Sequence, residues 1–345
     1  MSETAPLRLL LDGNALVANW RWLAEQGGDA ACGAAVKADG YGLGGREVVA
    51  RLAAAGCGDF FCATWDEAVA LGELPGGARL AVLHGVRAED MALARSARAR
   101  PVLNSVAQVA RWREAGGGAC DVMVDTGMNR LGLALDEAMG GALDGLTIDT
   151  LMSHLACADE PGHALNARQL AAFGALKDKV PAGRYSLANS AGILLGADYA
   201  FDLTRPGIAL YGGVPVAAAT GIQPVVGIEA QVLQVRQVRS GETVGYGATW
   251  TAPADTAVAI LNLGYADGYM RLFQPGAFAT AGDRRLPLAG RVSMDLTAVD
   301  IGGAEVKEGD WLRLDFDLPR LAARSDLSQY ELLTGLNLRF ERRWT

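Results

Sequence analysis

The chain has 345 residues, a net charge of −8 and a hydrophobic fraction of 50%, which is enough apolar material for one large α/β barrel with an attached domain. Its 31 basic and 39 acidic residues include no basic block, which argues against a nucleic-acid partner. The 44 glycines follow no repeat, so collagen-like and solenoid architectures are excluded.

The sequence also argues against export and against a metal site. The start, MSETAPLRLLLDG, lacks the basic segment and long apolar stretch of a secretory signal. No apolar run approaches the roughly 18 residues of a membrane span. The five cysteines are scattered without a CxxC pair, and the chain has three histidines, so we expect reduced thiols and no zinc cage. We therefore expect a cytoplasmic protein without a metal.

Over the first two thirds of the chain, short apolar runs alternate with helical patterns. Most of these runs are continuous rather than alternating, which is typical of strands buried on both faces. There are eight of them: AAVK (34–37), DFFCAT (59–64), RLAVLHG (79–85), PVLNS (101–105), CDVMVDTG (120–127), LTIDTLMSHLA (146–156), RYSLANS (184–190) and LTRPGIALYG (203–212).

The segments between these runs carry helix signals. Thr64–Glu67 and Ser105–Gln108 each fit a capping box, in which two side chains satisfy backbone donors at a helix start. Leu16, Trp20 and Leu23 share one face of an expected first helix. Eight strands, each followed by a helix, predict a (β/α)8 TIM-like barrel.

The pattern changes after Gly212. A linker of small residues, GVPVAAATGIQP, precedes short runs rich in Val, Leu and Ile that are separated by turns. These runs predict a mostly antiparallel β domain. We expect the barrel over residues 10–215 and the β-rich C-terminal domain over 216–345, joined by an N-terminal strand within 1–9.

Lys37 is the lysine whose position suggests chemistry. Lys177, Lys179 and Lys307 lie among charged neighbours, which is typical of a solvated surface. Lys37 ends the run AAV, so we expect it at the carboxyl-end mouth of the first barrel strand, where barrel active sites are built. A partly desolvated lysine there has a lowered pKa and can form a Schiff base with a carbonyl compound. The alternative is an ion pair with a neighbouring carboxylate such as Asp39.

Two loops have the composition of a phosphate site. They are ANSAG (188–192) and RPGIALYGG (205–213), which follow the seventh and eighth expected strands, where barrels often bind phosphate. Ser190 supplies a hydroxyl, and Gly207 lets backbone N–H groups approach an anion. Two ordinary turns are the alternative. An imine-forming amine and a phosphate cradle together indicate pyridoxal 5'-phosphate.

Three further polar positions lie at expected strand ends. Arg205 precedes a proline at the mouth of the eighth strand, where it is either a structural ion pair or a fixed cation beside a cofactor ring. His154 ends the sixth strand, and a core histidine with satisfied hydrogen bonds is its alternative. Arg130, in VDTGMNRLG, follows the fifth strand, where a capping turn with an exposed arginine explains the segment equally well.

Taken together and in order, the motifs of this chain resemble those of the alanine racemases, which are fold-type III pyridoxal-phosphate enzymes with a barrel and a C-terminal β domain. The match runs from Lys37 to the C-terminus. The motifs that carry it are AVKADGYGLG, VDTGMNRLG, SHLACADE, ANSAG, RPGIALYGG, VGYGATW, GYADGYMR, GRVSMD and SQYELL.

The resemblance implies a role for each matched residue. Lys37 is expected to carry the cofactor and to act as the base on one face of the substrate carbon, and Tyr246 of the partner subunit as the base on the opposite face. Arg205 is expected at the pyridine nitrogen and His154 near the ring. The expected phosphate contacts are Tyr41, Ser190, Gly207, Ile208 and Tyr330. The expected substrate-side residues are Arg130, which also lies near the phenolic oxygen, and Tyr265, Met294 and Asp295, the last three from the second subunit.

The chemistry of racemisation explains these residue types. A proton leaves one face of the α-carbon and another returns on the opposite face, so two bases must flank it. A group with a pKa of about 10 is rarely ionised at neutral pH, so we expect desolvation to tune Lys37, and a link through His154 to Arg205 to tune Tyr246. A permanently charged Arg205 should leave the ring nitrogen unprotonated, which favours racemisation over transamination.

The chain departs from the family pattern at three positions. Many members carry a lysine, often carbamylated, where this chain has Met123, so a different group (an anion or water) must orient Arg130. The usual CMD motif contains Ser293 here, and Leu43 replaces a common histidine. None of these changes removes a proposed catalytic group, although Met123 leaves room for an altered rate or substrate preference.

We therefore expect a homodimeric alanine racemase with shared active sites, with no nucleic-acid or membrane partner. A serine or broad-specificity racemase on the same scaffold is the close alternative; such relatives are often exported, so the lack of a signal favours alanine. A non-catalytic pyridoxal-phosphate-binding barrel would lack the second domain and a counterpart of Tyr246. A decarboxylase of this fold type usually needs a C-terminal cysteine, and none follows Cys157.

Overall fold

The computed structural model describes residues 5–274 and 276–345, so residues 1–4 of the expected N-terminal strand lie outside the described residues. The chain divides into two compact units. The first comprises Leu16–Gln223, and the second comprises the described residues up to Ala15 together with Pro224–Thr345. No helix of the described residues is long and apolar enough to cross a bilayer.

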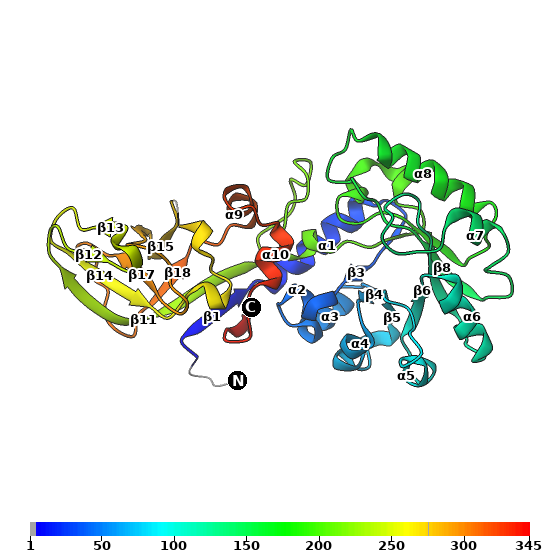
Figure 1. Cartoon of the computed structure of the whole chain (residues 1–345), viewed down its shortest axis with the longest axis horizontal. Helices are drawn as coiled ribbons and strands as arrows, with labels where there is room; N and C mark the ends of the chain where they lie inside the picture. The colour runs from blue at the N-terminus through cyan, green and yellow to red at the C-terminus, as the bar shows by residue number, and fades with distance from the viewer. Residues whose placement is uncertain (1–4, 275) are drawn as a thin grey trace. The chain divides into compact units, whose positions relative to one another are not determined.

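The first unit is the expected barrel of parallel strands (Figure 1). All eight predicted strands are confirmed. The first is shorter than the expected 34–37, and Gly33 separates it from a short strand that precedes it. The strands are β2 (Ala31–Cys32) with β3 (Ala34–Ala35), β4 (Asp59–Cys62), β5 (Arg79–Val82), β6 (Arg100–Leu103), β7 (Cys120–Met123), β8 (Ile148–Met152), β9 (Arg184–Ser186) and β10 (Leu203–Thr204).

Backbone hydrogen bonds close the barrel. The parallel pairings run in order from β3 to β9, and β10 pairs with β2. The N–H of Gly33 donates to the carbonyl of Thr204 (2.9 Å), which joins β10 to the first strand. The N–H groups of Asp202 and Arg205 donate to the carbonyls of Tyr185 (3.0 Å) and Ala188 (2.9 Å), which joins β10 to β9. The sheet therefore returns to its first strand.

Helices follow the first six strands and lie around the outside of the barrel (Figure 1). The expectation of a helix after every strand is wrong for the last two, which are followed only by the 3-10 turns η2 (Gly192–Leu195), η3 (Ala197–Tyr199) and η4 (Ile208–Tyr211). Gly196, with φ of +121°, separates η2 from η3 and prevents a continuous helix there. The α-helices are α1 (Gly13–Gln26), α2 (Lys37–Tyr41), α3 (Gly45–Ala54), α4 (Trp65–Leu71), α5 (Met91–Ser96), α6 (Val106–Glu114), α7 (Leu135–Met139) and α8 (Ala164–Lys177).

The two predicted capping boxes have different outcomes. Thr64 and Glu67 form the complete box at the start of α4. Ser105 caps α6 by accepting from the N–H of Gln108 (3.3 Å), as predicted. The Gln108 side chain, however, accepts from the N–H of Asn104 (3.0 Å) and not from that of Ser105, so the box is incomplete.

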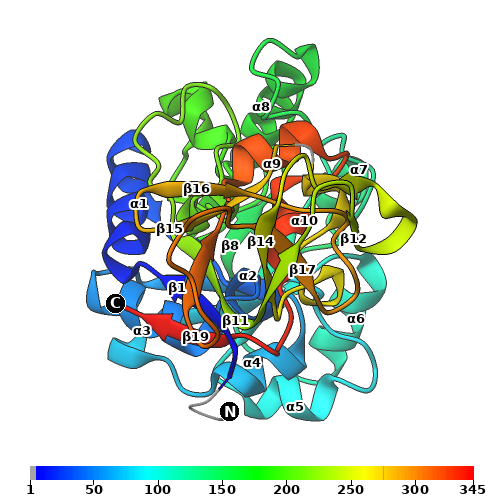
Figure 2. The same ribbon diagram turned by 90° about the vertical axis from the view of Figure 1, so that its left-hand side faces the viewer.

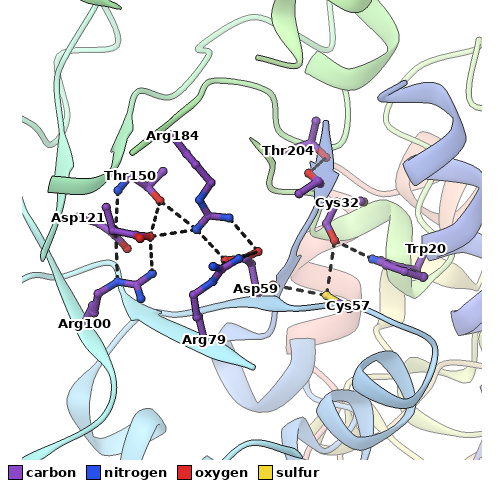
Figure 3. A network of polar contacts seen from close by, with 12 residues as sticks. Trp20, Cys32, Cys57, Asp59, Arg79, Arg100, Asp121, Thr150, Arg184 and Thr204 are labelled. Carbon is purple, nitrogen blue, oxygen red and sulfur yellow. Dashed lines mark hydrogen bonds and ion pairs between the residues drawn. The ribbon is translucent and has the colours of Figure 1, made fainter. Parts of the chain in front are cut away.

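The barrel interior has an apolar layer above a charged layer. The apolar layer is contributed by six strands: Phe61, Ala81, Val102, Met123, Met152 and Leu203. At the amino ends of the strands, three arginines and three aspartates form a network (Figure 3). Its ion pairs are Arg79–Asp59 (2.8 Å), Arg184–Asp59 (2.9 Å), Arg184–Asp149 (3.0 Å), Arg100–Asp149 (2.9 Å) and Arg100–Asp121 (3.4 Å).

The second unit is the predicted antiparallel β domain, with one parallel pair between β1 (Leu7–Leu11) and β19 (Glu341–Trp344). The long strand β11 (Val226–Val238) pairs with β1 and β18 over its first half and with β14 over its second half. Figure 2 shows β1, β11 and β14 of this unit. The other elements are β12 (Thr243–Val244), β13 (Trp250–Thr251), β14 (Thr256–Leu261), β15 (Phe278–Ala281), β16 (Arg284–Pro287), β17 (Thr297–Asp300), β18 (Trp311–Leu314), α9 (Leu318–Arg324) and α10 (Gln329–Thr334).

Candidate active site

Lys37 begins a turn of left-handed backbone at the carboxyl end of β3. Ala38, Asp39, Gly40 and Tyr41 have φ values of +52°, +53°, +64° and +56°. For a residue with a side chain this conformation is unfavourable by roughly 1–2 kcal/mol. Such a run persists only where the surrounding structure holds it, and it is typical of functional sites.

Three contacts hold this turn. A carboxylate oxygen of Glu67, at the start of α4, accepts from the N–H of Ala38 (2.7 Å). The carboxylate of Asp39 accepts from the N–H of Gly45 (2.7 Å), so it starts α3 and does not pair with Lys37 as the alternative interpretation required. The ring of Tyr41 stacks on that of Tyr211 at 4.5 Å. The lysine is therefore carried by a rigid backbone.

The surroundings of Lys37 make its ammonium group a stronger acid than that of a free lysine. Burial lowers its pKa below the usual value, and the positive charge of Arg130 lowers it further, while Glu67 acts in the opposite direction. The side chain nevertheless remains accessible, because it stands at an open barrel mouth. A neutral amine is the form that attacks a carbonyl group or accepts a proton.

The loops after β9 and β10 meet at Ser190. Its hydroxyl oxygen lies 2.8 Å from the N–H of Gly207 and 3.3 Å from that of Ala209, and it accepts from both. A Cβ at Gly207 would stand 2.2 Å from the Tyr41 hydroxyl, so only glycine fits this position. Ile208, which follows, is buried. The structure thus brings together four of the five expected phosphate contacts, and this cradle of hydroxyls and backbone donors fits a phosphate group.

Arg205 is a buried cation with neutral partners. Its guanidinium donates to the hydroxyl of Ser186 and to the backbone carbonyl of Ser153 (2.5 Å). Burial lowers its pKa to about 10, so it remains charged at neutral pH. Among the residues that the structure describes, it forms no ion pair, so the structural interpretation is not supported. The positive charge of Arg205 can therefore interact with a group that binds at the carboxyl-end mouth of the barrel.

His154 stands beside these cations in its neutral form. Burial, together with the positive charges of Arg205, Arg130 and Lys37, lowers its pKa to about 3. The expected side-chain link from His154 to Arg205 is absent from the described part of the chain, where the guanidinium of Arg205 donates to Ser186 and Ser153. The influence of Arg205 on His154 is therefore electrostatic.

Arg130 lies at the exposed rim of the mouth. It is close enough to lower the pKa of both Lys37 and His154. Met123, at the position of the family's lysine, is 7% exposed and packs in the apolar layer of the barrel. It offers Arg130 no charged partner, and Arg130 forms no ion pair with another residue of the described ranges 5–274 and 276–345.

The remaining predicted residues belong to the second unit. Tyr246, in the 3-10 turn η5 (Tyr246–Ala248), is 69% exposed and lines a hollow of about 430 Å³ with Arg291 and Ser293. The N–H of Tyr265 donates to the carbonyl of Ser293 (3.0 Å), which places the loop of Tyr265 against the loop of Met294. Both loops therefore adjoin the Tyr246 hollow.

Asp295, in a loop, and Tyr330, in a helix, also belong to the second unit. The Asp295 carboxylate pairs with Arg339 (2.6 Å), which also contacts Asp267 (3.3 Å). Tyr330, on α10, is 47% exposed. Both side chains are therefore presented at the surface of the second unit rather than buried in its core.

Sequence reasoning missed the residues that support the site. Glu67 was identified only as part of a capping box, although one of its oxygens also holds the backbone of Ala38. Gln169, fully buried on α8, donates to the carbonyl of His154 (2.9 Å). A polar residue on the buried face of a helix was the available signal.

Comparisons with known proteins agree along the whole chain. The family models "Alanine racemase, N-terminal domain" and "Alanine racemase, C-terminal domain" match residues 11–215 and 225–344. An alanine racemase of Dinoroseobacter shibae is 46% identical, over 99% of this chain and 98% of that protein.

Solved structures agree with the sequence matches. A crystal structure of alanine racemase from Bartonella henselae with covalently bound pyridoxal phosphate has a TM-score of 0.89 at 34% identity, over 99% of this chain and 100% of that one. The biosynthetic alanine racemase of Pseudomonas aeruginosa has a TM-score of 0.88 at 35% identity, with the same coverage.

Proposed function

The chain belongs to the alanine racemase family, and we propose that it interconverts L- and D-alanine with two bases, Lys37 and Tyr246, on opposite faces of the substrate carbon. One observation carries the assignment of the site. The rigid turn that begins at Lys37 also carries Tyr41, whose hydroxyl occupies the space against Gly207. The amine and the phosphate cradle therefore form one site.

The residues of this mouth suit pyridoxal 5'-phosphate. Lys37 would hold it covalently, the cradle of Tyr41, Ser190, Gly207 and Ile208 would hold its phosphate, and Arg205 would face the ring nitrogen. When bound, this cofactor withdraws electrons from the substrate α-carbon and so weakens its C–H bond. The relative from Bartonella henselae, described with covalently bound pyridoxal phosphate, supports this assignment.

The chain's own side chains would handle the proton and the charges. The neutral amine of Lys37 accepts a proton from one face of the carbon, and the Tyr246 hydroxyl supplies one on the other face. Arg130, which has no carboxylate partner among the described residues, would bind the substrate carboxylate. Neutral His154 and cationic Arg205 together favour the unprotonated ring nitrogen.

We place Tyr246 in the site of a second copy of the chain. The support is its exposure together with that of Leu296 (40% exposed), which lines the same hollow, and of Met294 (54% exposed), which follows Ser293 of that hollow in the chain. Exposed apolar side chains of this kind are typical of surfaces covered by a partner. In that homodimer Tyr265, Met294 and Asp295 would line the substrate side.

A mixing experiment tests the shared site. Homodimers of Lys37→Ala and of Tyr246→Phe should each be inactive, whereas exchanged subunits form heterodimers with one intact site. Random exchange should restore about a quarter of wild-type activity. No recovery after demonstrated subunit exchange would contradict the shared site.

Substrate preference tests the assignment to alanine. Turnover of L-alanine by the wild-type protein should exceed that of L-serine and L-lysine. Faster turnover of either of the other amino acids would overturn it.

A further inference from the structure

Helix α8 carries a polar pair on its buried face. Asn166, Gln169, Phe173 and Leu176 are its buried residues, and Gln169 has no exposed surface. A buried amide is unfavourable unless its hydrogen bonds are made. The Gln169 amide makes three, so its position is strongly determined.

The bonds of Gln169 lead to the ends of two strands. Its NH2 group donates to the hydroxyl of Thr126, after β7 (3.1 Å), and to the carbonyl of His154, after β8 (2.9 Å). Its carbonyl accepts from the N–H of Ala156 (2.9 Å). One side chain thus holds the backbone on both sides of Leu155 and joins it to the neighbouring strand end.

The network continues from Thr126 to Arg205. The hydroxyls of Thr126 and Ser153 share a buried hydrogen bond of 2.7 Å. The carbonyl of Ser153 accepts from the Arg205 guanidinium (2.5 Å), and its N–H donates to the carbonyl of Ser186 (3.0 Å). The hydroxyl of Ser186 is the other acceptor of Arg205. Four neighbouring strand ends are therefore linked to one helix.

We propose that Gln169 is a positioning residue that, with Thr126 and Ser153, sets the orientation of both His154 and Arg205 from the outer helix layer. This inference rests on the roles proposed above for His154 and Arg205. Gln169 and Thr126 act through other residues and are not assigned a contact with the cofactor. Their effect on the reaction is to keep the neutral imidazole and the guanidinium in fixed places.

Asn166 provides a matched control on the same helix. It is 2% exposed, and its NH2 group donates to the carbonyls of Cys157 and Glu160 (both 3.0 Å), in the same β8–α8 loop. None of its bonds reaches His154 or Thr126. Loss of Asn166 should therefore weaken the loop without releasing the site.

The first test measures His154 directly. The chain has three histidines, so labelled imidazole signals can be assigned by NMR. In the protein as purified, His154 should not titrate above pH 5, because its pKa is about 3. In Gln169→Met its pKa should rise toward the ordinary value of about 6.5, because the loosened loop admits water. In Asn166→Leu it should remain low.

The second test uses the absorption spectrum and kinetics of the cofactor-loaded enzyme. Gln169→Met and Thr126→Val should change the pH dependence of the visible band and lower kcat about 10- to 100-fold, with a smaller change in KM. Thr126→Ser, which keeps the hydroxyl, should restore both.

The outcomes separate the two proposals. If Asn166→Leu shifts the His154 titration as much as Gln169→Met does, or if neither variant shifts it, the positioning role is wrong. If the wild-type protein does not racemise alanine, the proposed function is wrong. The His154 titration would still decide the role of Gln169.

Discussion

The two ends of the barrel differ in whether their cationic side chains form ion pairs. At the amino ends of the strands, Arg79, Arg100 and Arg184 each face at least one carboxylate (Figure 3). At the carboxyl-end mouth, Lys37 and Arg205 form no ion pair with any residue that the structure describes. The barrel thus carries paired charges at its amino end and, within the described residues, cations without ion pairs at its carboxyl end.

We interpret the charges at the amino end as stabilising the fold and those at the carboxyl-end mouth as serving the site. A buried charge is costly unless it is paired, so a network of pairs closes the amino end at a tolerable free energy. Burial is the main cause that lowers the pKa of Lys37 and of His154, and the positive charge of Arg130 lowers both further. The cations of the mouth also produce a positive potential, which attracts phosphate and carboxylate groups.

Removal of the mouth amine is the strongest test of the comparison. Lys37→Ala should abolish racemisation, with a loss of about 10³-fold or more, and should remove the visible absorption of the covalently held cofactor. Thermal unfolding should change little, since the lysine is not part of the core. Retention of the visible band in the variant would refute Lys37 as the anchor.

Removal of the phenol tests the second base. Tyr246→Phe should suppress abstraction of the α-proton from one alanine enantiomer by about 10²- to 10⁴-fold, and much less from the other. Exchange of the α-proton with deuterated solvent, measured separately for L- and D-alanine, gives both rates. Equal and small effects on the two enantiomers would contradict bases on opposite faces.

A broken pair at the amino end should affect stability alone. Asp59 accepts hydrogen bonds from two arginines, so Asp59→Asn should lower the free energy of unfolding by about 2–4 kcal/mol, reduced from the fully buried case because Arg79 is 45% exposed. Urea unfolding measures the loss.

The exposed pair Arg98–Glu73 gives the control for that variant. Glu73→Gln should change the free energy of unfolding by less than about 0.5 kcal/mol. If folded Asp59→Asn protein loses its cofactor absorption, the proposed separation of the two ends is wrong.

The pH dependence of stability gives the smallest effect. Burial raises the pKa of Asp121 to about 6, so the folded protein holds this proton more tightly than the unfolded chain does. Ionisation of Asp121 therefore lowers stability as the pH rises from about 4 through 6. Asp121→Asn should exceed the wild type in free energy of unfolding by roughly 1–3 kcal/mol at pH 8, with a smaller gap at pH 5.

Asp149 provides the opposite sign in the same network. Hydrogen bonds and charges of Arg100 and Arg184 outweigh burial and lower its pKa. Its ionised form therefore stabilises the fold, and Asp149→Asn should be less stable than the wild type at pH 8. A gain in stability from Asp149→Asn would show that the pairing assigned to this network is wrong.

A feature could be predicted from the sequence when the residues that form it lie close together in the chain. The barrel strands were recognisable because each is a local apolar run, and the Thr64 cap because its two residues are three apart. The helices expected after β9 and β10 were wrong because Gly196 and short loops favour 3-10 turns there. The ion pair of Arg184 with Asp59 joins residues 125 apart and left no local signal.

The sequence by itself determined the order of strands, the motif residues at their ends and the second domain, because hydrophobic periodicity and turn chemistry act between near neighbours. Only the tertiary structure decided which polar groups meet. Barrel closure brings Ser190 to Gly207, Gln169 to Thr126, and Arg205 to Ser153. Burial then shifts the pKa of Lys37, His154 and Asp121, since the free energy of a charge depends on all of its neighbours and not on its place in the chain.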